Sequence, residues 1–326
     1  MQKRATIKDI AKALDISVST VSRGLRDHPD ISKDMCQLIK DKAKELNYHP
    51  NHIAAGLRKR SSKIIALIIP EISMFFFPSV IKGVEEVARE NGYQLLVLQS
   101  NDDLEHEKRN IQMCLDHSVE GILISLSNKT SNIDHLINLP ASGIPVVFFD
   151  KSIENSPFDE VVIDDEDVAF QAVKNLVHEG CKNIAIILGN ENLLITKRRE
   201  RGARLALVNA NVEATFVYAE SFNKAQIALA DYLSSHHPDG MFLMSDELMA
   251  AASQPLSGKD CLVVGISDGM IPEIVNFPLK YFYHSGFEIG KLAASKLVHR
   301  ILMSTEGGQN TPAERIILDV KMHSLH

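Results

Sequence analysis

The segment from residue 6 to residue 23 combines small and hydrogen-bonding side chains at helical spacing, the residue types that a helix needs to read DNA. A helix in the major groove requires small residues for close approach and donors for base edges or phosphates. From these residues alone, an ordinary amphipathic helical hairpin is an equally good interpretation. We expect base contacts from Val18, Ser19 and Arg23, and phosphate contacts or packing roles for Ser17, Thr20 and Ser22.

Three short helices are predicted to hold this surface. Thr6 can cap the first helix, with Asp9 as the acidic partner of a capping box, and Asp15 stands where the chain must turn. Ser17 caps the second helix, and Ser32 opens the third. The three helices can share a core, because the third carries an apolar stripe made of Ile31, Met35, Leu38, Ile39, Ala43 and Leu46.

Four motifs in the first sixty residues carry a resemblance to a known family. They are Thr6-Ile-Lys-Asp-Ile-Ala11, Val18-Ser-Thr-Val-Ser-Arg23, Leu46-Asn-Tyr-His-Pro-Asn51 and Ile53-Ala-Ala-Gly-Leu-Arg58. In order and spacing they resemble the DNA-binding head and hinge of the LacI (lactose-repressor) family of transcription regulators. The resemblance implies a helix-turn-helix head over 1–48, a hinge helix and linker over 49–62, and an effector-binding and dimerisation domain over 63–326.

The resemblance also implies a homodimer and further DNA contacts, at Thr6, Asn51, Ala54, Leu57 and Arg58. Segment 51–58 is too short to be a stable helix alone, and Gly56 weakens it, so we expect it to fold only when two copies pair on DNA. Leu57 would then enter a minor-groove step, as the corresponding leucine does in the family, and an ordinary packing role is the alternative. Two heads related by dyad symmetry require a palindromic operator.

Charge distinguishes the head from the rest of the chain. Residues 1–60 hold 13 Lys and Arg against 7 Asp and Glu, a balance of +6, whereas the remaining residues have a balance of −13. A basic head on an acidic body limits the attraction to DNA phosphates to one end of the chain.

After residue 62, short apolar strands alternate with amphipathic helices in two series, which predicts an α/β fold with two doubly wound parallel-sheet subdomains. The first series has strands from 64–69 to 145–149, and the second begins at 161–163 and ends with a strand at 316–321. The resemblance implies periplasmic-binding-protein-like subdomains, with crossings near 157–160, 283–286 and 311–316. The N-subdomain then takes about 63–158 and 285–312, and the C-subdomain about 159–284 and 313–326.

Seven candidate effector-binding residues follow predicted strands, since ligands of such sheets bind beyond the carboxyl ends of the strands. They are Phe76, Phe77, Ser125, Asp150, Arg199, Phe222 and Asp246. Polar groups beside an aromatic face suit a small polyhydroxylated ligand, and the resemblance points to Arg199 and Asp246 as well. The plain alternatives are core packing for the paired phenylalanines, helix capping for Ser125 and Asp150, and a solvated helix face for Arg199.

One departure from the family pattern bears on the effector. The segment 249–258 is shorter than the corresponding helix and loop of the family. This difference keeps open a regulator that answers to a protein partner or to no effector at all.

Other function classes find little support in the sequence. We expect no enzyme, cofactor or metal, because no Gly-x-Gly-x-x-Gly, P-loop, Gly-x-Ser-x-Gly or metal-ligand spacing occurs. The four cysteines are far apart, no apolar run is long enough to cross a bilayer, and the first residues lack a signal-peptide core, so we expect a cytoplasmic protein. A solute-binding protein for transport would suit the body but not the basic head. We therefore expect a sequence-specific DNA-binding repressor whose operator affinity is set by a carbohydrate or related metabolite.

Overall fold

The computed structural model describes residues 5–46, 48, 61–73, 76–219, 222–305 and 311–324. The chain divides into two compact units, Met1–Ser62 and Lys63–His326, which we call the head and the body. The predicted hinge contacts at Asn51, Ala54, Leu57 and Arg58 lie outside the described residues. No helix of the described part is long and apolar enough to cross a membrane.

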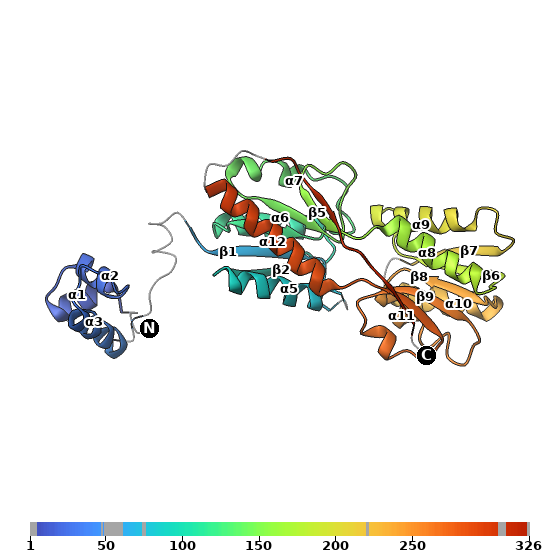
Figure 1. The fold of residues 1–326 in the computed structure, drawn as a ribbon, viewed down its shortest axis with the longest axis horizontal. Helices are drawn as coiled ribbons and strands as arrows, with labels where there is room; N and C mark the ends of the chain where they lie inside the picture. The colour runs from blue at the N-terminus through green and yellow to red at the C-terminus, as the bar shows by residue number, and fades with distance from the viewer. Residues whose placement is uncertain are drawn as a thin grey trace. The chain divides into compact units, whose positions relative to one another are not determined.

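The head consists of three helices, α1 (Ile7–Leu14), α2 (Val18–Gly24) and α3 (Lys33–Glu45) (Figure 1). The capping box is present, since both the backbone N–H and the hydroxyl of Thr6 donate to Asp9 Oδ2 at 2.7 Å. Asp15 ends α1 in the left-handed conformation, at φ 52°, as predicted for the turn. The shared core contains Ile10, Ala11, Val21, Ile39 and Ala43. Leu38 was wrongly placed on the apolar stripe, because its side chain is half exposed.

The first sheet of the body has the strand order β11-β5-β4-β3-β1-β2. Its strands are β1 (Ile64–Ile69), β2 (Gln94–Gln99), β3 (Gly121–Ile124), β4 (Val146–Phe149), β5 (Asp159–Val162) and β11 (Arg315–Ile317). Alternate residues of β1 enter two separate cores, one shared with α5 (Phe77–Glu90) and α12 (Gly286–Thr305), the other with α6 (Leu104–Asp116) and α7 (Asp134–Ile137). Helices therefore cover both faces of this sheet (Figure 1).

The second sheet has the order β12-β10-β9-β8-β6-β7. Its strands are β6 (Asn183–Leu188), β7 (Glu213–Tyr218), β8 (Gly240–Leu243), β9 (Leu262–Ser267), β10 (Leu279–Tyr283) and β12 (Met322–Ser324). The helices α8 (Asp165–His178), α9 (Leu194–Leu207), α10 (Phe222–Ser235) and α11 (Asp246–Ala252) pack with it, α8 against α9 and α10 against α11. The contact between α8 and α9 requires glycine at residue 202, because a Cβ there would lie 2.0 Å from the backbone oxygen of Glu166.

The two doubly wound subdomains are confirmed, but three details of their layout differ from the prediction. The strand at 159–162 pairs with β4 in the first sheet, so it does not open the second series. The single strand predicted at 316–321 is two strands, β11 in the first sheet and β12 in the second, and β12 runs antiparallel to β10. The crossing predicted at 283–286 is confirmed at 284–285, but the other two lie at 163–164 and 318–321, so the subdomain boundaries at 158 and 312 were wrong.

Local patterning explains these errors. A short buried run such as 159–162 carries no signal for which sheet it joins, since the same pattern suits a last strand beside β4 and a first strand of the next sheet. The long helix α12 was also missing from the prediction, although residues 285–312 were assigned to the first subdomain.

Candidate functional site

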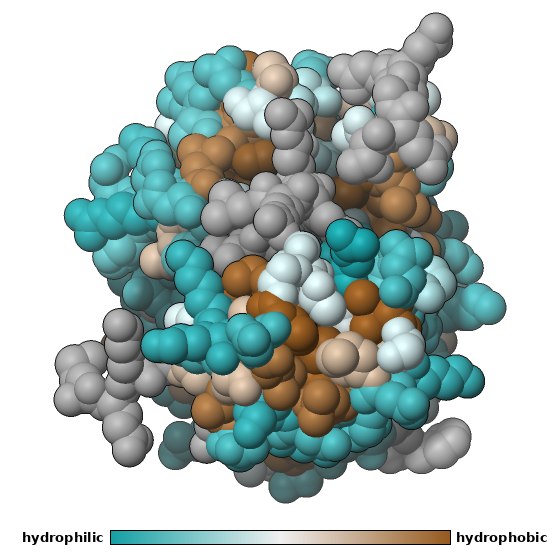
Figure 2. Space-filling view, turned by 90° about the vertical axis from the view of Figure 1, so that its left-hand side faces the viewer, coloured by the Kyte–Doolittle hydropathy of each residue, from teal (hydrophilic) through white to brown (hydrophobic). Residues whose placement is uncertain are grey.

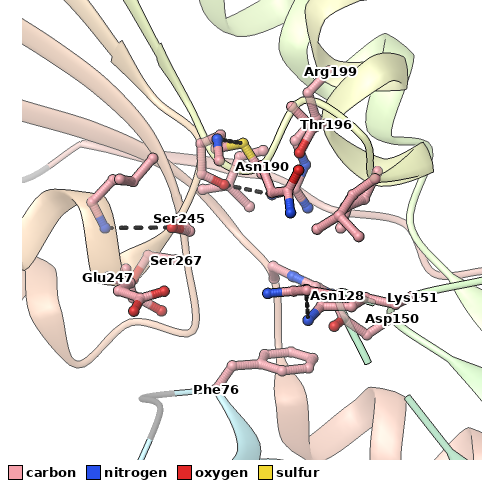
Figure 3. A pocket seen from close by; sticks show the side chains of 18 of the residues that line it. Phe76, Asn128, Asp150, Lys151, Asn190, Thr196, Arg199, Ser245, Glu247 and Ser267 are labelled. Atoms are coloured by element: carbon pink, nitrogen blue, oxygen red, sulfur yellow. Dashed lines mark hydrogen bonds between the residues drawn. The ribbon is translucent and has the colours of Figure 1, made fainter. Parts of the chain in front are cut away.

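A cavity of about 150 Å³ lies where the carboxyl ends of strands from both sheets come together. Figure 3 shows Phe76 on one side of it and Asn190, Thr196 and Arg199 on the opposite side. Ser245 and Glu247 stand at one end, and Asn128, Asp150 and Lys151 at the other. Because the walls come from both sheets, a molecule bound here contacts both subdomains at once.

Arg199 is buried in the wall and already has several partners. Its Nε and Nη2 lie 2.9 and 2.8 Å from Asp165 Oδ1, and its Nη1 donates to the carbonyl oxygen of Met244 at 2.5 Å. Arg199 is 3 % exposed and Asp165 is 2 % exposed. The pair therefore fixes α9 to the start of α8, and the helix face expected to be solvated is buried at this residue.

Asp246 is the first residue of α11 and projects into the same cavity. Its carboxylate accepts a hydrogen bond from the Ser267 hydroxyl and another from the backbone N–H of Asp268, the latter at 2.8 Å. Burial nevertheless raises the pKa of Asp246 to about 6. A carboxylate held in a cavity at the cost of desolvation is typical of a binding site.

Two buried polar atoms on the cavity wall have no hydrogen-bond partner among the described residues. They are the hydroxyl oxygen of Thr196 and Nε2 of His284. The His284 ring lies 4.5 Å from the ring of Phe76, centre to centre, and burial lowers the pKa of His284 to about 3. Buried polar groups are normally satisfied, so these two atoms indicate where a ligand hydroxyl would bind.

Asp150 and Lys151 close the remaining side of the cavity after β4. Asp150 adopts a left-handed backbone conformation, at φ 59°, and burial raises the pKa of its carboxyl group. The Lys151 ammonium donates to Asn128 Oδ1 at 2.6 Å and lies 3.6 Å from Asp102.

Five of the seven predicted effector residues line the cavity: Phe76, Phe77, Asp150, Arg199 and Asp246. The other two do not. Ser125 is fully buried beneath it, where its hydroxyl donates to Asp150 Oδ2 at 3.3 Å, and Phe222 lies outside it, where its backbone N–H donates to Glu247 at 3.2 Å. The residues that the sequence analysis missed include Asn128, Lys151, Asn190, Thr196, Glu247 and His284.

On the head, the predicted reading face of α2 is accessible. Ser17, Val18, Ser19 and Arg23 are exposed, whereas Thr20 and Ser22 are partly buried. The Ser17 hydroxyl accepts from the backbone N–H of Thr20 at 3.0 Å, which caps α2 as expected. Among the described residues, the ion-pair partner of Arg23 is Asp30, at a long 3.4 Å, and both side chains are at least half exposed.

On the face shown in Figure 2, hydrophobic residues lie among hydrophilic ones. Among the described residues of the head, the exposed large apolar side chains are Val18 and Leu38. An exposed valine on a reading helix suits apolar contact with a thymine methyl group.

A helix-turn-helix head and a two-sheet body with a ligand cavity define a DNA-binding regulator with a small-molecule domain. Comparison with protein families gives the same result. Residues 6–51 match the model described as bacterial regulatory proteins, lacI family, and residues 62–302 match that of periplasmic binding proteins and sugar binding domain of LacI family. The chain belongs to the LacI family, whose members are DNA-binding transcriptional repressors with sugar-binding effector domains.

Similar proteins and structures agree with this assignment. The ribose operon repressor of Bacillus subtilis (strain 168) is 29 % identical over 303 residues, which are 90 % of this chain and 91 % of that protein. The regulator MalR of Streptococcus pneumoniae serotype 4 is 35 % identical over 209 residues, 62 % of each chain. The structure of the Lac repressor dimer bound to operator and the anti-inducer ONPF covers 98 % of both chains with a TM-score of 0.83 at 20 % identity. At that identity, the match shows the fold alone.

Proposed function

We propose that this chain binds a palindromic DNA operator as a cytoplasmic homodimer and represses transcription, with operator affinity set by a small hydroxyl-rich effector in the body cavity. Base contacts come from Val18, Ser19 and Arg23, and Ser17, Thr20 and Ser22 hold phosphates or pack. Thr6, Asn51, Ala54, Leu57 and Arg58 stay as predicted DNA contacts.

One observation supports the effector above all: the cavity wall holds a desolvated carboxylate, Asp246, beside two buried polar atoms without partners, on Thr196 and His284. Each of these three groups can interact with a hydroxyl. The aromatic ring of Phe76 faces Thr196 across the cavity (Figure 3), and the His284 ring lies against Phe76, with 4.5 Å between the ring centres. Ligand sites commonly join a few placed polar groups to an apolar surface.

Coupling to DNA follows from the position of the cavity. An occupant touches both subdomains, so it favours one subdomain orientation over another and changes operator affinity through that preference. Such a coupling is reciprocal, so operator DNA changes the affinity for the effector by the same factor.

The test begins with selection of an operator from random-sequence duplexes by the full-length chain. Fluorescence anisotropy then measures operator affinity with and without sugars that raise the melting temperature of the protein. We expect a selected palindromic site and at least one sugar that changes its affinity. A sugar that binds but leaves operator affinity unchanged would contradict the coupling, and failure to select any site would contradict DNA reading.

A regulator controlled by a protein partner is the second candidate, favoured by the short segment 249–258. In the structure, α11 ends at Ala252 and a turn replaces further helix. If no small molecule binds while operator binding is intact, this second candidate takes precedence.

A further inference from the structure

The charged groups around the cavity set which ligands it can accept. Four carboxyl groups line it, those of Asp150, Asp246, Glu247 and Asp268. The two cationic side chains in the lining are those of Lys151 and Arg199, and the one imidazole is that of His284. Acidic groups therefore outnumber basic ones in the wall.

Both cations already have protein partners. Arg199 is held by Asp165 and by the Met244 carbonyl, and Lys151 by Asn128 and Asp102. Arg199 keeps further N–H donors, but its charge is already offset by Asp165, so an anionic ligand would place a second negative group beside that buried carboxylate. The Lys151 charge is likewise shared with Asp102, so neither cation is an unpaired charge for a phosphate.

The acidic groups add repulsion. A phosphate ester carries nearly two negative charges at neutral pH, and it would face the carboxyl group of Glu247, whose Oε1 accepts from the backbone N–H of Phe222 at 3.2 Å. Burial raises the pKa of Glu247, and the Lys151 charge lowers it in part. Asp268 accepts from the backbone N–H of Gly286 at 2.7 Å and from the side chain of Ser79, and the charge of Lys82 acts on it from nearby. Both carboxylates therefore keep oxygen atoms available for hydroxyl donors.

A neutral polyol satisfies the same walls. Its hydroxyl groups donate to the carboxylates and also interact with the unpartnered Thr196 oxygen and His284 Nε2. The apolar face of a sugar ring packs on Phe76. The His284 ring lies against Phe76, with 4.5 Å between the ring centres. No ion pair of the wall has to break for such a ligand to bind.

We propose that the cavity selects an unphosphorylated, uncharged sugar or polyol and rejects its phosphate esters, with Glu247 as a specificity-determining residue. This inference rests on the proposed function, since it concerns the effector of the same site. Conversion of Glu247 to a cation would remove the repulsion and supply an unpaired donor, so it would admit phosphate esters.

The test is isothermal titration calorimetry on the full-length chain with matched pairs: ribose and ribose 5-phosphate, glucose and glucose 6-phosphate, fructose and fructose 1-phosphate. We expect at least one free sugar to bind, and its phosphate ester to bind at least tenfold more weakly. Glu247→Lys should reduce or reverse this ratio, and Glu247→Gln should reduce it by a smaller factor. Glu213→Lys makes the same charge change at an exposed residue of β7, and it should leave the ratio unchanged.

Three results would overturn the inference. If a phosphate ester binds as tightly as its free sugar, or more tightly, the inference fails while effector control of the operator stands. If folded Glu247→Lys and Glu247→Gln both keep the wild-type ratio, the role of Glu247 is wrong. If neither member of any pair binds a chain that still binds its operator, the inference fails together with the effector half of the proposed function.

Discussion

The reading face of α2 and the body cavity use polar residues in opposite ways. On α2 the side chains of Ser19 and Arg23 are exposed, and within the described part of the head the charge of Arg23 is paired by a 3.4 Å contact with Asp30. In the cavity, Arg199 is 3 % exposed and makes short contacts with a buried carboxylate and a carbonyl.

The difference reflects the two targets. DNA brings its own dense charge, so a surface that binds it needs free donors and loses little by leaving them in water. A neutral effector brings no charge, so the buried charges of its cavity must be paired within the protein. The groups left to contact the ligand are then those that can hydrogen-bond to hydroxyls. Substitutions in the two regions should therefore affect different measurements, stability for the cavity and DNA affinity for α2.

The largest effect is expected at the buried ion pair. Arg199→Met should lower the free energy of unfolding by about 3–5 kcal/mol, because it leaves Asp165 buried without its partner. The double variant Arg199→Met with Asp165→Leu should recover much of that loss, and urea denaturation measures both. Equal stability of the single and double variants would show that the pair is not what holds α8 to α9.

Unlike Arg199, the ionised Asp246 side chain should lower the stability of the folded chain. Its pKa, raised from 3.8 to about 6, means that the folded chain keeps a proton in this pH range that the unfolded chain has lost. The group therefore lowers stability as the pH rises from about 4 to 6, by up to about 3 kcal/mol in full.

Asp246→Asn should raise the free energy of unfolding at pH 7, although weaker hydrogen bonds with Ser267 and Asp268 should offset part of this gain. The same variant should weaken sugar binding more than tenfold. His284 titrates with the opposite sign, since its lowered pKa makes stability fall as the pH falls below about 6.5. The difference between Asp246→Asn and wild type, measured across pH 4–7, isolates the carboxyl group. A difference that does not change with pH would contradict the assigned titration.

Arg23→Ala should lower the affinity for operator DNA without changing the stability of the fold. Loss of one bidentate base contact costs about 1–3 kcal/mol of operator affinity, and the melting temperature should stay within about 1 °C because the side chain is half exposed. Arg26→Ala, at an exposed arginine just after α2, is the matched control and should cost less affinity. Equal losses in the two variants would reduce Arg23 to a phosphate contact.

Only a small change in stability is expected at Thr196. Thr196→Val removes a buried hydroxyl that has no partner among the described residues, so unfolding should change by less than about 1 kcal/mol. Sugar affinity should fall about tenfold, which calorimetry can measure. Unchanged affinity would show that this hydroxyl faces no ligand.

Much of the fold could be predicted from the sequence, because its signals are local. Thr6, Ser17 and Ser32 mark the starts of the three head helices by their capping chemistry, and Asp15 marks the turn. Short apolar runs likewise predict most of the strands from local sequence. The sheet that β5 and β11 join could not be predicted, because a short apolar run does not specify its pairing partner. β5 joins the sheet of β4, the strand just before it, whereas β11 pairs with β5, with Arg315 opposite Glu160.

The cavity was predictable only in part for a related reason. Strand ends led to Asp150 and Asp246, which project from them into the cavity. Ser125 failed the same rule because its side chain points under Asp150, and Phe222 failed because it begins α10 outside the lining of the cavity. His284 follows β10, a strand absent from the prediction. The rule that ligand-binding residues follow strands therefore holds for His284, but it could not be applied without that strand.

The central claim is that an occupant of the cavity changes operator affinity. The most direct measurement is operator affinity by fluorescence anisotropy at pH 7, with and without a saturating sugar found by calorimetry, for wild type and Asp246→Asn. We predict that the sugar changes the wild-type affinity at least about fivefold, and that Asp246→Asn binds the operator normally but does not respond. A wild-type protein that binds the sugar and holds its operator with the same affinity in both conditions would contradict the account.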